Sequence, residues 1–544
     1  MGSSPIGPAK LKGSTINVDP FFFRNIAVGR LYLNFNNRLL LALISGSLLF
    51  LSFPKYGVGN VAWIALIPLL LAVQKGSVKS ALTAGFFTGL VFNVGIIYWI
   101  ALVVVNYGYL PLAIGLVAML FLAAYLSIYV ALFAGGISYL RGKGINQIIA
   151  APLLWTCLEY IKSHLFTGFP WENLAYSQYL NPKVIQIADI TGIYGITFVI
   201  VLINAVFCNL LNCCMYGYNG KSWKRPVIEI TGALLLLMGI FIYGNLRISE
   251  VQAKLKIAPS LDIALIQGNI DQSIKWNPQN QQETLTTYKF LSNLKPASSS
   301  GLIVWPETAV PFYIQDMDAR SRQVYQVAKD TGHWLLFGSP SYLKEQNNTS
   351  YLNSAFLISP EGRISGRYDK VHLVPYGEYV PLRSVFPFIG KLAVGVGDFR
   401  GGEDYHPLAM NNHQIGVLIC YEAIFPEASR SYKNMGAELL VNITNDAWFG
   451  FSSAPYQHLS MTVFRAVENR LYLLRAANTG ISAIVNPAGE IVAHSALFVR
   501  TSLLGKVRFI DTRTFYMAYG DAFVYLCLIS LAAILVNFRK GRKQ

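Results

Sequence analysis

Four side chains with catalytic potential stand at the ends of predicted strands in the second half of the chain. Glu307 follows the apolar run GLIVWP, Lys370 follows SGRYD, Glu378 lies in VPYGEYVP, and Cys420 ends QIGVLIC. A cysteine nucleophile requires a base for its proton, a cation that favours the thiolate, and hydrogen-bond donors for the oxyanion. A single glutamate after an apolar strand is more often a solvated strand end. These residues therefore indicate a site only as a set.

Cys420 differs from the other cysteines in its position. The other five, Cys157, Cys208, Cys213, Cys214 and Cys527, lie in or beside long apolar segments. Cys420 therefore has no disulfide partner within its own domain, although disulfides are the usual role of cysteine outside the cytoplasm. The alternative role is that of a small buried core residue. No histidine in this half of the chain has a local context that marks it as the base.

The composition excludes an ordinary soluble protein. Of the 544 residues, 53% are hydrophobic and 13% are charged, and the mean hydropathy is +0.41; soluble domains average about 25% charged residues. The net charge of +16 comes largely from basic residues beside the apolar segments. This placement indicates topology signals that meet anionic lipids, not a nucleic-acid surface. No metal-ligand spacing is present, since an isolated Cys213–Cys214 pair is too weak a signal.

Eight apolar segments are candidates for membrane spans. They cover residues 39–53, 61–73, 81–105, 110–140, 148–166, 194–212, 227–246 and 522–538. If all eight cross, sixteen basic residues fall on one side, and the short loops of the other side hold only Lys55, Lys162 and Lys183. The positive-inside rule then places both termini in the cytoplasm. The second segment is the weakest candidate, but omitting it scatters the basic residues over both sides.

The spans divide the chain into four parts. We predict a cytoplasmic tail over 1–37, a membrane domain with seven spans over 38–250, an extracytoplasmic domain over 255–505, and a final span with a basic cytoplasmic tail over 515–544. In the extracytoplasmic part, strands are expected at 261–270, 301–307, 333–343, 353–370 (as a hairpin), 414–420 and 437–445, and the clearest helical pattern covers 453–475. This alternation predicts a layered α/β domain.

The order of these motifs resembles a known superfamily. WPETAVP with Glu307, YDKVHLVPYGEYVP with Lys370 and Glu378, and GVLICYE with Cys420 follow the order Glu, Lys, Cys of the nitrilase superfamily of carbon-nitrogen hydrolases. The amino-acid sequences of these motifs resemble those of one membrane-bound branch, the apolipoprotein N-acyltransferases. Further matching motifs are QGNIDQSIKW, FTGFPWENLAYSQ, NDAWFG and RAVENR. The resemblance covers residues 38–540.

The resemblance implies an α-β-β-α sandwich and a ping-pong acyl transfer that needs no cofactor. The partners would be a phospholipid acyl donor and a diacylated apolipoprotein acceptor, with no nucleic acid. The enzyme would be a multi-pass monomer of the bacterial inner membrane with a periplasmic catalytic domain. Cys420 would attack the acyl ester, Glu307 would act as general base and then acid, and Lys370 would lower the pKa of the thiol.

Four further residues would support these three. The backbone N–H of Tyr421 would stabilise the oxyanion with Lys370, and Glu378 would orient Lys370 and the incoming amine. Glu422 would lie behind the site as a supporting carboxylate. Trp276 would either wall the acyl pocket or pack in the core. Because several carboxylates surround one lysine, at least one of them is expected to have a raised pKa.

Two other functions use parts of the same sequence. A membrane-anchored amidase or nitrilase would hydrolyse a small carbon-nitrogen substrate with the same three residues, but eight spans exceed what an anchor needs. A transporter or receptor would show internal repeats or broken charged helices at mid-bilayer, and neither is evident. Two further expectations concern the surroundings of the site. The run 384–399 would be a lid or a buried hairpin, and Glu159 would pair with Lys162 at the outer end of the fifth span.

Overall fold

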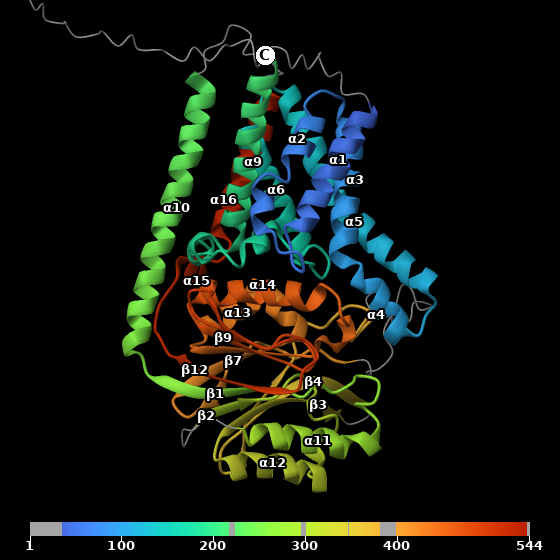
Figure 1. Cartoon of the computed structure of the whole chain (residues 1–544), viewed down its shortest axis with the longest axis vertical. Helices are drawn as coiled ribbons and strands as arrows, with labels where there is room; N and C mark the ends of the chain where they lie inside the picture. Colours follow the sequence, from blue (N-terminus) through green and yellow to red (C-terminus); the bar gives the residue numbers. More distant parts are fainter. Residues whose placement is uncertain (1–34, 217–223, 295–300, 346–347, 381–398, 541–544) are drawn as a thin grey trace, which may run out of the picture.

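The computed structural model describes residues 35–216, 224–294, 301–345, 348–380 and 399–540. A bundle of helices stands on a domain with two β-sheets (Figure 1). Most of the predicted tail 1–37 and most of the run 384–399 lie outside the described residues.

Helices occur at all eight predicted apolar segments. They are α1 (Phe35–Leu51), η1 with α2 (Gly59–Trp63 and Ile67–Ala72), α3 with α4 (Val78–Ile97 and Trp99–Gly108), α5 (Leu112–Gly142), α6 (Gln147–His164), α9 (Ile193–Tyr216), α10 (Lys224–Ile257) and α16 (Ala522–Lys540). Among the described residues, α3, α5, α9 and α10 are long and apolar enough to cross a membrane by length and composition. The structure thus contains a helical membrane domain, within which α10 stands at the periphery (Figure 1).

The second domain is an α-β-β-α sandwich, as the resemblance implies. One sheet has the order β12-β1-β2-β3-β4-β5 and the other β11-β10-β9-β8-β7-β6. The strands are β1 (Ser260–Gln267), β2 (Gly301–Val304), β3 (Trp334–Glu345), β4 (Asn348–Ile358), β5 (Ile364–Asp369), β6 (Leu408–Met410), β7 (His413–Ile419), β8 (Leu439–Thr444), β9 (Tyr472–Ala477), β10 (Ala483–Val485), β11 (Ile491–His494) and β12 (Thr501–Arg508). Each sheet has a parallel centre, β1-β2-β3 and β7-β8-β9, with antiparallel edges.

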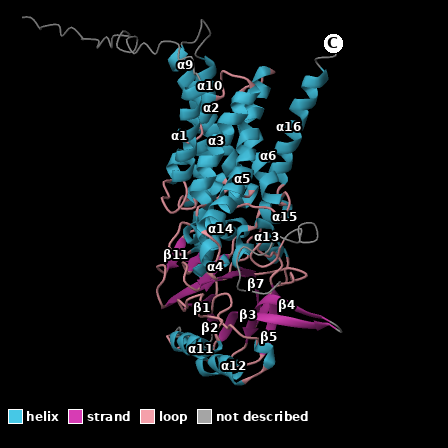
Figure 2. Ribbon diagram, turned by 90° about the vertical axis from the view of Figure 1, so that its right-hand side faces the viewer, coloured by secondary structure: helices cyan, strands magenta, loops and turns pink. Residues whose placement is uncertain are grey.

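Helices cover the outer face of each sheet. The first sheet carries α11 (Pro278–Ser292) and α12 (Ala319–Thr331) on the side far from the bundle. The second carries α13 (Pro426–Asn434) and α14 (Ala454–Asn469), which lie between this sheet and the bundle (Figures 1 and 2). The central strands β2 and β8 are buried along their whole length, because both faces of a parallel sheet are covered.

One predicted element is wrong at its end. The helical pattern over 453–475 becomes α14, which ends at Asn469, and the strand β9 begins at Tyr472. Arg470 has a left-handed backbone with φ of 52° and closes the helix. No glycine or proline marks this position, so the sequence pattern continues through it. The predicted hairpin over 353–370 is confirmed by the antiparallel pair β4 and β5.

Candidate active site

Cys420 follows β7 at the carboxyl edge of the second sheet. It opens a 3-10 turn, Cys420–Ile424, and has a left-handed backbone with φ of 53°. This conformation costs a non-glycine residue about 1 to 3 kcal/mol and persists only where the surroundings enforce it. Its side chain is largely buried, with 9% exposed surface.

Lys370 follows β5 and is the buried cation of the site. Its Nζ lies 2.8 Å from Glu378 Oε2 and 3.9 Å from Glu307 Oε1, and the residue is only 1% exposed. Burial alone would lower the pKa of Lys370, but the carboxylates of Glu378 and Glu307 outweigh it and raise the pKa above its ordinary value. The ammonium therefore stays charged at neutral pH.

Glu307 lies three residues beyond β2, and hydrogen bonds hold both of its oxygens. Oε1 accepts from Asn353 Nδ2 at 2.8 Å, and Oε2 accepts from the backbone N–H of Asn445 at 2.9 Å. The same Asn353 nitrogen donates to Glu378 Oε1 at 2.9 Å. The amide thus joins the two carboxylates that flank Lys370. Asn353 was not predicted, because nothing in the sequence sets it apart within β4.

The thiol of Cys420 is protonated in this environment. Burial raises its pKa, and the charge of Glu307 raises it further, while Lys370 and a hydrogen bond with Thr444 lower it without reversing the shift. A protonated thiol is a weak nucleophile, so attack requires a base. Glu307 and Lys370 are among the groups whose charges act on this sulfur. The structure thus brings the three predicted residues together.

Glu422 connects the cysteine turn to the lysine segment. Its Oε1 accepts from Tyr368 Oη at 2.7 Å and from the backbone N–H groups of Val371 and His372 at 2.8 and 3.1 Å, and its Oε2 accepts from the N–H of Ile419 at 2.7 Å. Burial raises the pKa of Glu422 to about 7 against the opposing effect of these bonds. The expectation of a carboxylate with a raised pKa is confirmed here, although burial is the cause.

The two aromatic candidates lie in different segments of the catalytic domain. The Tyr421 ring packs edge-on against Phe425, with 5.1 Å between the ring centroids, and is buried. Trp276 is half-buried, in the segment between β1 and α11. Its indole nitrogen is buried and has no hydrogen-bond partner within the described part of the chain.

Comparison with known proteins identifies the family of both domains. A family model described as "Apolipoprotein N-acyltransferase N-terminal domain" matches residues 45–206, and one described as "Carbon-nitrogen hydrolase" matches residues 262–514. An apolipoprotein N-acyltransferase of Geobacter metallireducens is 46% identical over 499 residues, which cover 91% of this chain and 94% of the relative. The chain belongs to the apolipoprotein N-acyltransferase family.

More distant members of the family match over a similar length. The apolipoprotein N-acyltransferases of Pasteurella multocida and Methylococcus capsulatus are 31% and 32% identical, and each match covers 89% of this chain and 92% of the relative. The chain is therefore an acyltransferase built on the carbon-nitrogen hydrolase fold, and the family supports this function over the amidase alternative. This chain combines the catalytic fold with a domain of apolar helices.

A second buried lysine lies beside Glu307 and was not predicted. Lys275 is fully buried, and its Nζ donates to Thr308 Oγ1 at 2.6 Å and to the carbonyl oxygen of Glu307 at 3.3 Å. Burial lowers the pKa of Lys275 to about 7, although the charge of Glu307 opposes the shift. The signal in the sequence was its place beside Trp276 in the family motif QGNIDQSIKW.

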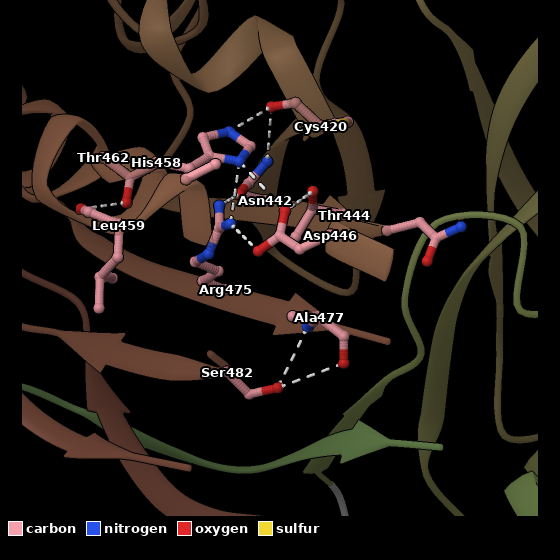
Figure 3. Close-up of polar contacts among 12 residues, drawn as sticks. Cys420, Asn442, Thr444, Asp446, His458, Leu459, Thr462, Arg475, Ala477 and Ser482 are labelled. Carbon is pink, nitrogen blue, oxygen red and sulfur yellow. Dashed lines mark hydrogen bonds and ion pairs between the residues drawn. The ribbon is translucent and has the colours of Figure 1, made fainter. Parts of the chain in front are cut away.

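A buried polar network lies behind the cysteine (Figure 3). The carbonyl oxygen of Cys420 accepts from Asn442 Nδ2 at 3.3 Å and lies 3.1 Å from His458 Nε2. Arg475 contacts Asn442 and forms an ion pair with Asp446 at 2.7 Å. These four side chains are all buried. His458 thus faces the main chain of the cysteine, which agrees with its rejection as the base.

The predicted pairing of Glu159 with Lys162 is confirmed only in part, because the two charges interact without a close ion pair. Its carboxylate accepts from Trp155 Nε1 at 3.0 Å, from the backbone N–H of Leu174 at 2.6 Å and from Thr197 Oγ1 at 2.8 Å. No ion pair within 4.0 Å joins it to Lys162 among the residues described. The helix spacing allowed that pair, but the loop after α6 folds back and satisfies the carboxylate instead. Glu159 thereby fixes this loop, which carries Trp171, on the bundle.

Proposed function

We propose that this enzyme moves an acyl chain from a phospholipid to the α-amine of the N-terminal diacylglyceryl-cysteine of lipoproteins, through a thioester on Cys420. The single observation that carries the assignment of residues is the position of Lys370 between Glu378 and Glu307, with Cys420 in the same electrostatic environment. Family membership supplies the substrates.

In the first half-reaction, Glu307 takes the thiol proton while Cys420 attacks the ester carbonyl. Both oxygens of Glu307 are fixed by hydrogen bonds, so the base needs no reorganisation. Lys370 and the Tyr421 N–H stabilise the oxyanion. The intermediate collapses with loss of the lysophospholipid alkoxide, which takes the proton from Glu307.

In the second half-reaction, the lipoprotein amine attacks the thioester. Glu307, ionised again, accepts a proton from the amine, and Cys420 leaves as a thiolate and is reprotonated. Glu378 orients Lys370 through the 2.8 Å ion pair, and Glu422 holds the backbone that follows Lys370. We place Trp276 at the wall of the acyl pocket.

The membrane arrangement follows from the charge pattern. All eight apolar segments cross, both termini are cytoplasmic, and residues 255–505 lie in the periplasm of the inner membrane. The position of α13 and α14 against the bundle supports a site close to the outer leaflet. The parts 1–37, 38–250, 255–505 and 515–544 form the tail, membrane domain, catalytic domain and final span of a monomer.

The test uses purified full-length protein in detergent with an alkyne-tagged phospholipid. A hydroxylamine-sensitive tagged adduct on the Cys420 peptide is expected, and addition of a diacylated lipopeptide should move the tag to its amine. Glu307→Gln should slow adduct formation by about 100 to 10,000-fold, and Cys214→Ala serves as the control. Acyl transfer by Cys420→Ala would refute the proposal. Hydrolysis of small amides without an adduct would favour the amidase alternative.

A further inference from the structure

Two neighbouring residues of α14 contact opposite sides of the domain boundary. Gln457 is fully buried and contacts the membrane domain with both ends of its amide. Its nitrogen donates to the carbonyl oxygens of Pro54 and Ile96, each at 3.2 Å. Its oxygen accepts from the indole N–H groups of Trp99 and Trp171 at 3.2 and 2.9 Å. One side chain thus joins four separate points of the membrane domain.

The next residue, His458, contacts the nucleophile. Its Nε2 lies 3.1 Å from the carbonyl oxygen of Cys420 (Figure 3). Its Nδ1 lies between Arg475 Nη2 at 3.0 Å and Asp446 Oδ1 at 3.2 Å. A carbonyl oxygen can only accept a hydrogen bond. Nε2 therefore carries the hydrogen and donates it to Cys420. Burial and the charge of Arg475 lower the pKa of His458 and outweigh the opposing effect of Asp446, so the imidazole is neutral at neutral pH.

The carbonyl of Cys420 and the N–H of Tyr421 belong to one peptide group. In a planar trans peptide these two groups point in opposite directions, so fixing one fixes the other. Asn442 and His458 donate to this carbonyl from the side of the second sheet and α14. The left-handed backbone of Cys420 needs such restraint. The direction of the Tyr421 N–H is thus set by donors behind the site.

We infer that Gln457 and His458 are positioning residues that lock the Cys420–Tyr421 peptide in the orientation required for the oxyanion, and that the membrane domain supplies the anchor for this lock. The inference rests on the proposed function, because it assigns the Tyr421 N–H to the oxyanion. It also gives the membrane domain a second role besides holding the catalytic domain at the membrane. The side chain that holds the nucleophile's backbone is adjacent to one clamped by Trp99 and Trp171.

The competing role for His458 is that of general base for the thiol. The geometry opposes it, because Nε2 donates to the main-chain oxygen of Cys420 and Nδ1 is held between Arg475 and Asp446. Neither nitrogen is then available to take a proton from sulfur. The two roles differ in what they predict for the reactivity of the thiol itself, which does not need an oxyanion hole.

The experiment compares His458→Phe with His458→Gln in the full-length enzyme. Phe keeps a ring but has no donor, whereas the Gln amide replaces Nε2–H. Single-turnover acylation by tagged phospholipid should fall about 100-fold in His458→Phe, with KM for phospholipid little changed, and should recover in His458→Gln. The rate of Cys420 alkylation by iodoacetamide, followed on its peptide across pH, should be unaltered in both. If His458→Phe does not fold, His458→Met takes its place as the variant without a donor, because Met is equal in length to Gln.

Gln457→Leu should lower the acylation rate in the same way. The control is His413→Phe, which replaces a half-buried histidine stacked on Phe509. Wild-type acylation rates in His458→Phe, or failure of His458→Gln to recover, would overturn the inference. A shifted pH profile of alkylation in His458→Phe would make His458 the base. If wild-type enzyme forms no thioester at all, the proposed function fails instead.

Discussion

The side-chain amide nitrogen of Asn353 lies 2.8 Å from Oε1 of Glu307 and holds this carboxylate in the site. Asn353 is also tied to Lys370, whose backbone N–H donates to the Asn353 carbonyl oxygen at 2.8 Å. The base Glu307 and the cation Lys370 are therefore both hydrogen-bonded to one residue of β4. This explains how two strand ends of the first sheet keep a fixed separation.

Replacing Asn353 with alanine should loosen both carboxylates. Glu307 and Glu378 would each lose one donor and keep their other partners, and a hydrogen bond to a charged group contributes about 1.5 to 3 kcal/mol. We expect a lower melting temperature and slower thioester formation, measured by thermal unfolding and by the tagged-lipid assay. Asn348→Ala, at the exposed start of β4, is the control. Unchanged acylation in Asn353→Ala would contradict this role.

Gly338 allows the Glu307 segment to lie close to β3. A Cβ at this position would stand 2.4 Å from the backbone nitrogen of Thr308 and 2.7 Å from the Cα of Glu307. Gly338→Ala should therefore displace Glu307 and reduce acylation by about 100-fold, since small misplacements of catalytic groups have effects of this size. Gly142→Ala, where a Cβ meets nothing within 4 Å, should retain the wild-type rate.

Lys275 should make stability depend on pH in a defined direction. Its pKa is lowered from 10.5 to about 7 in the folded protein, so between about pH 7 and 10.5 the unfolded chain binds more protons than the folded one. The contribution of Lys275 to the free energy of unfolding therefore rises with pH across this range and is smallest below pH 7. Lys275→Met removes this dependence.

The measurement is the difference in melting temperature between wild type and Lys275→Met as a function of pH. The melting temperature of wild type should rise relative to that of Lys275→Met from pH 7 to 10. Lys289→Met, which removes a half-exposed lysine of α11, should run parallel to wild type. A constant difference between wild type and Lys275→Met would show that the lysine keeps its ordinary pKa.

The proposed topology can be tested with a native thiol. Cys214 is exposed near the end of α9, a position that the topology places in the cytoplasm. A membrane-impermeant maleimide should label it only in permeabilised cells or inverted vesicles. A cysteine introduced at Lys289 should be labelled in intact spheroplasts. The reverse pattern would place the catalytic domain in the cytoplasm.

The sequence predicted the parts of the site that lie at strand ends. Glu307 and Cys420 follow apolar runs and Lys370 follows a polar strand, so the three residues could be selected only as an ordered set of motifs that resembles a known superfamily. Asn353 lies inside a strand, and its role comes from the pairing of β4 with β3 and β5. Such long-range register is not encoded in a local pattern.

The polar network behind Cys420 was missed for a similar reason. Arg475 lies within the apolar strand YLLRAA, and Asp446 belongs to a separate turn. The favourable pairing of these two charges depends on the parallel alignment of β8 and β9. The helix prediction through 475 failed at the same place, because the turn at Arg470 is fixed by tertiary contacts, including its 2.6 Å ion pair with Asp189.

The length of α10 has a consequence for how lipid reaches the sulfur. Its 34 residues measure about 51 Å, against about 30 Å for the hydrocarbon layer. If α10 crosses as proposed, the ion pair of Arg247 with Asp189 at 2.8 Å marks the headgroup level. Asp189 also binds Arg470 at the end of α14. The end of α14 would then rest at the headgroup level, which shortens the length of fatty tail that must leave the bilayer, at about 0.8 kcal/mol per methylene, before it is transferred.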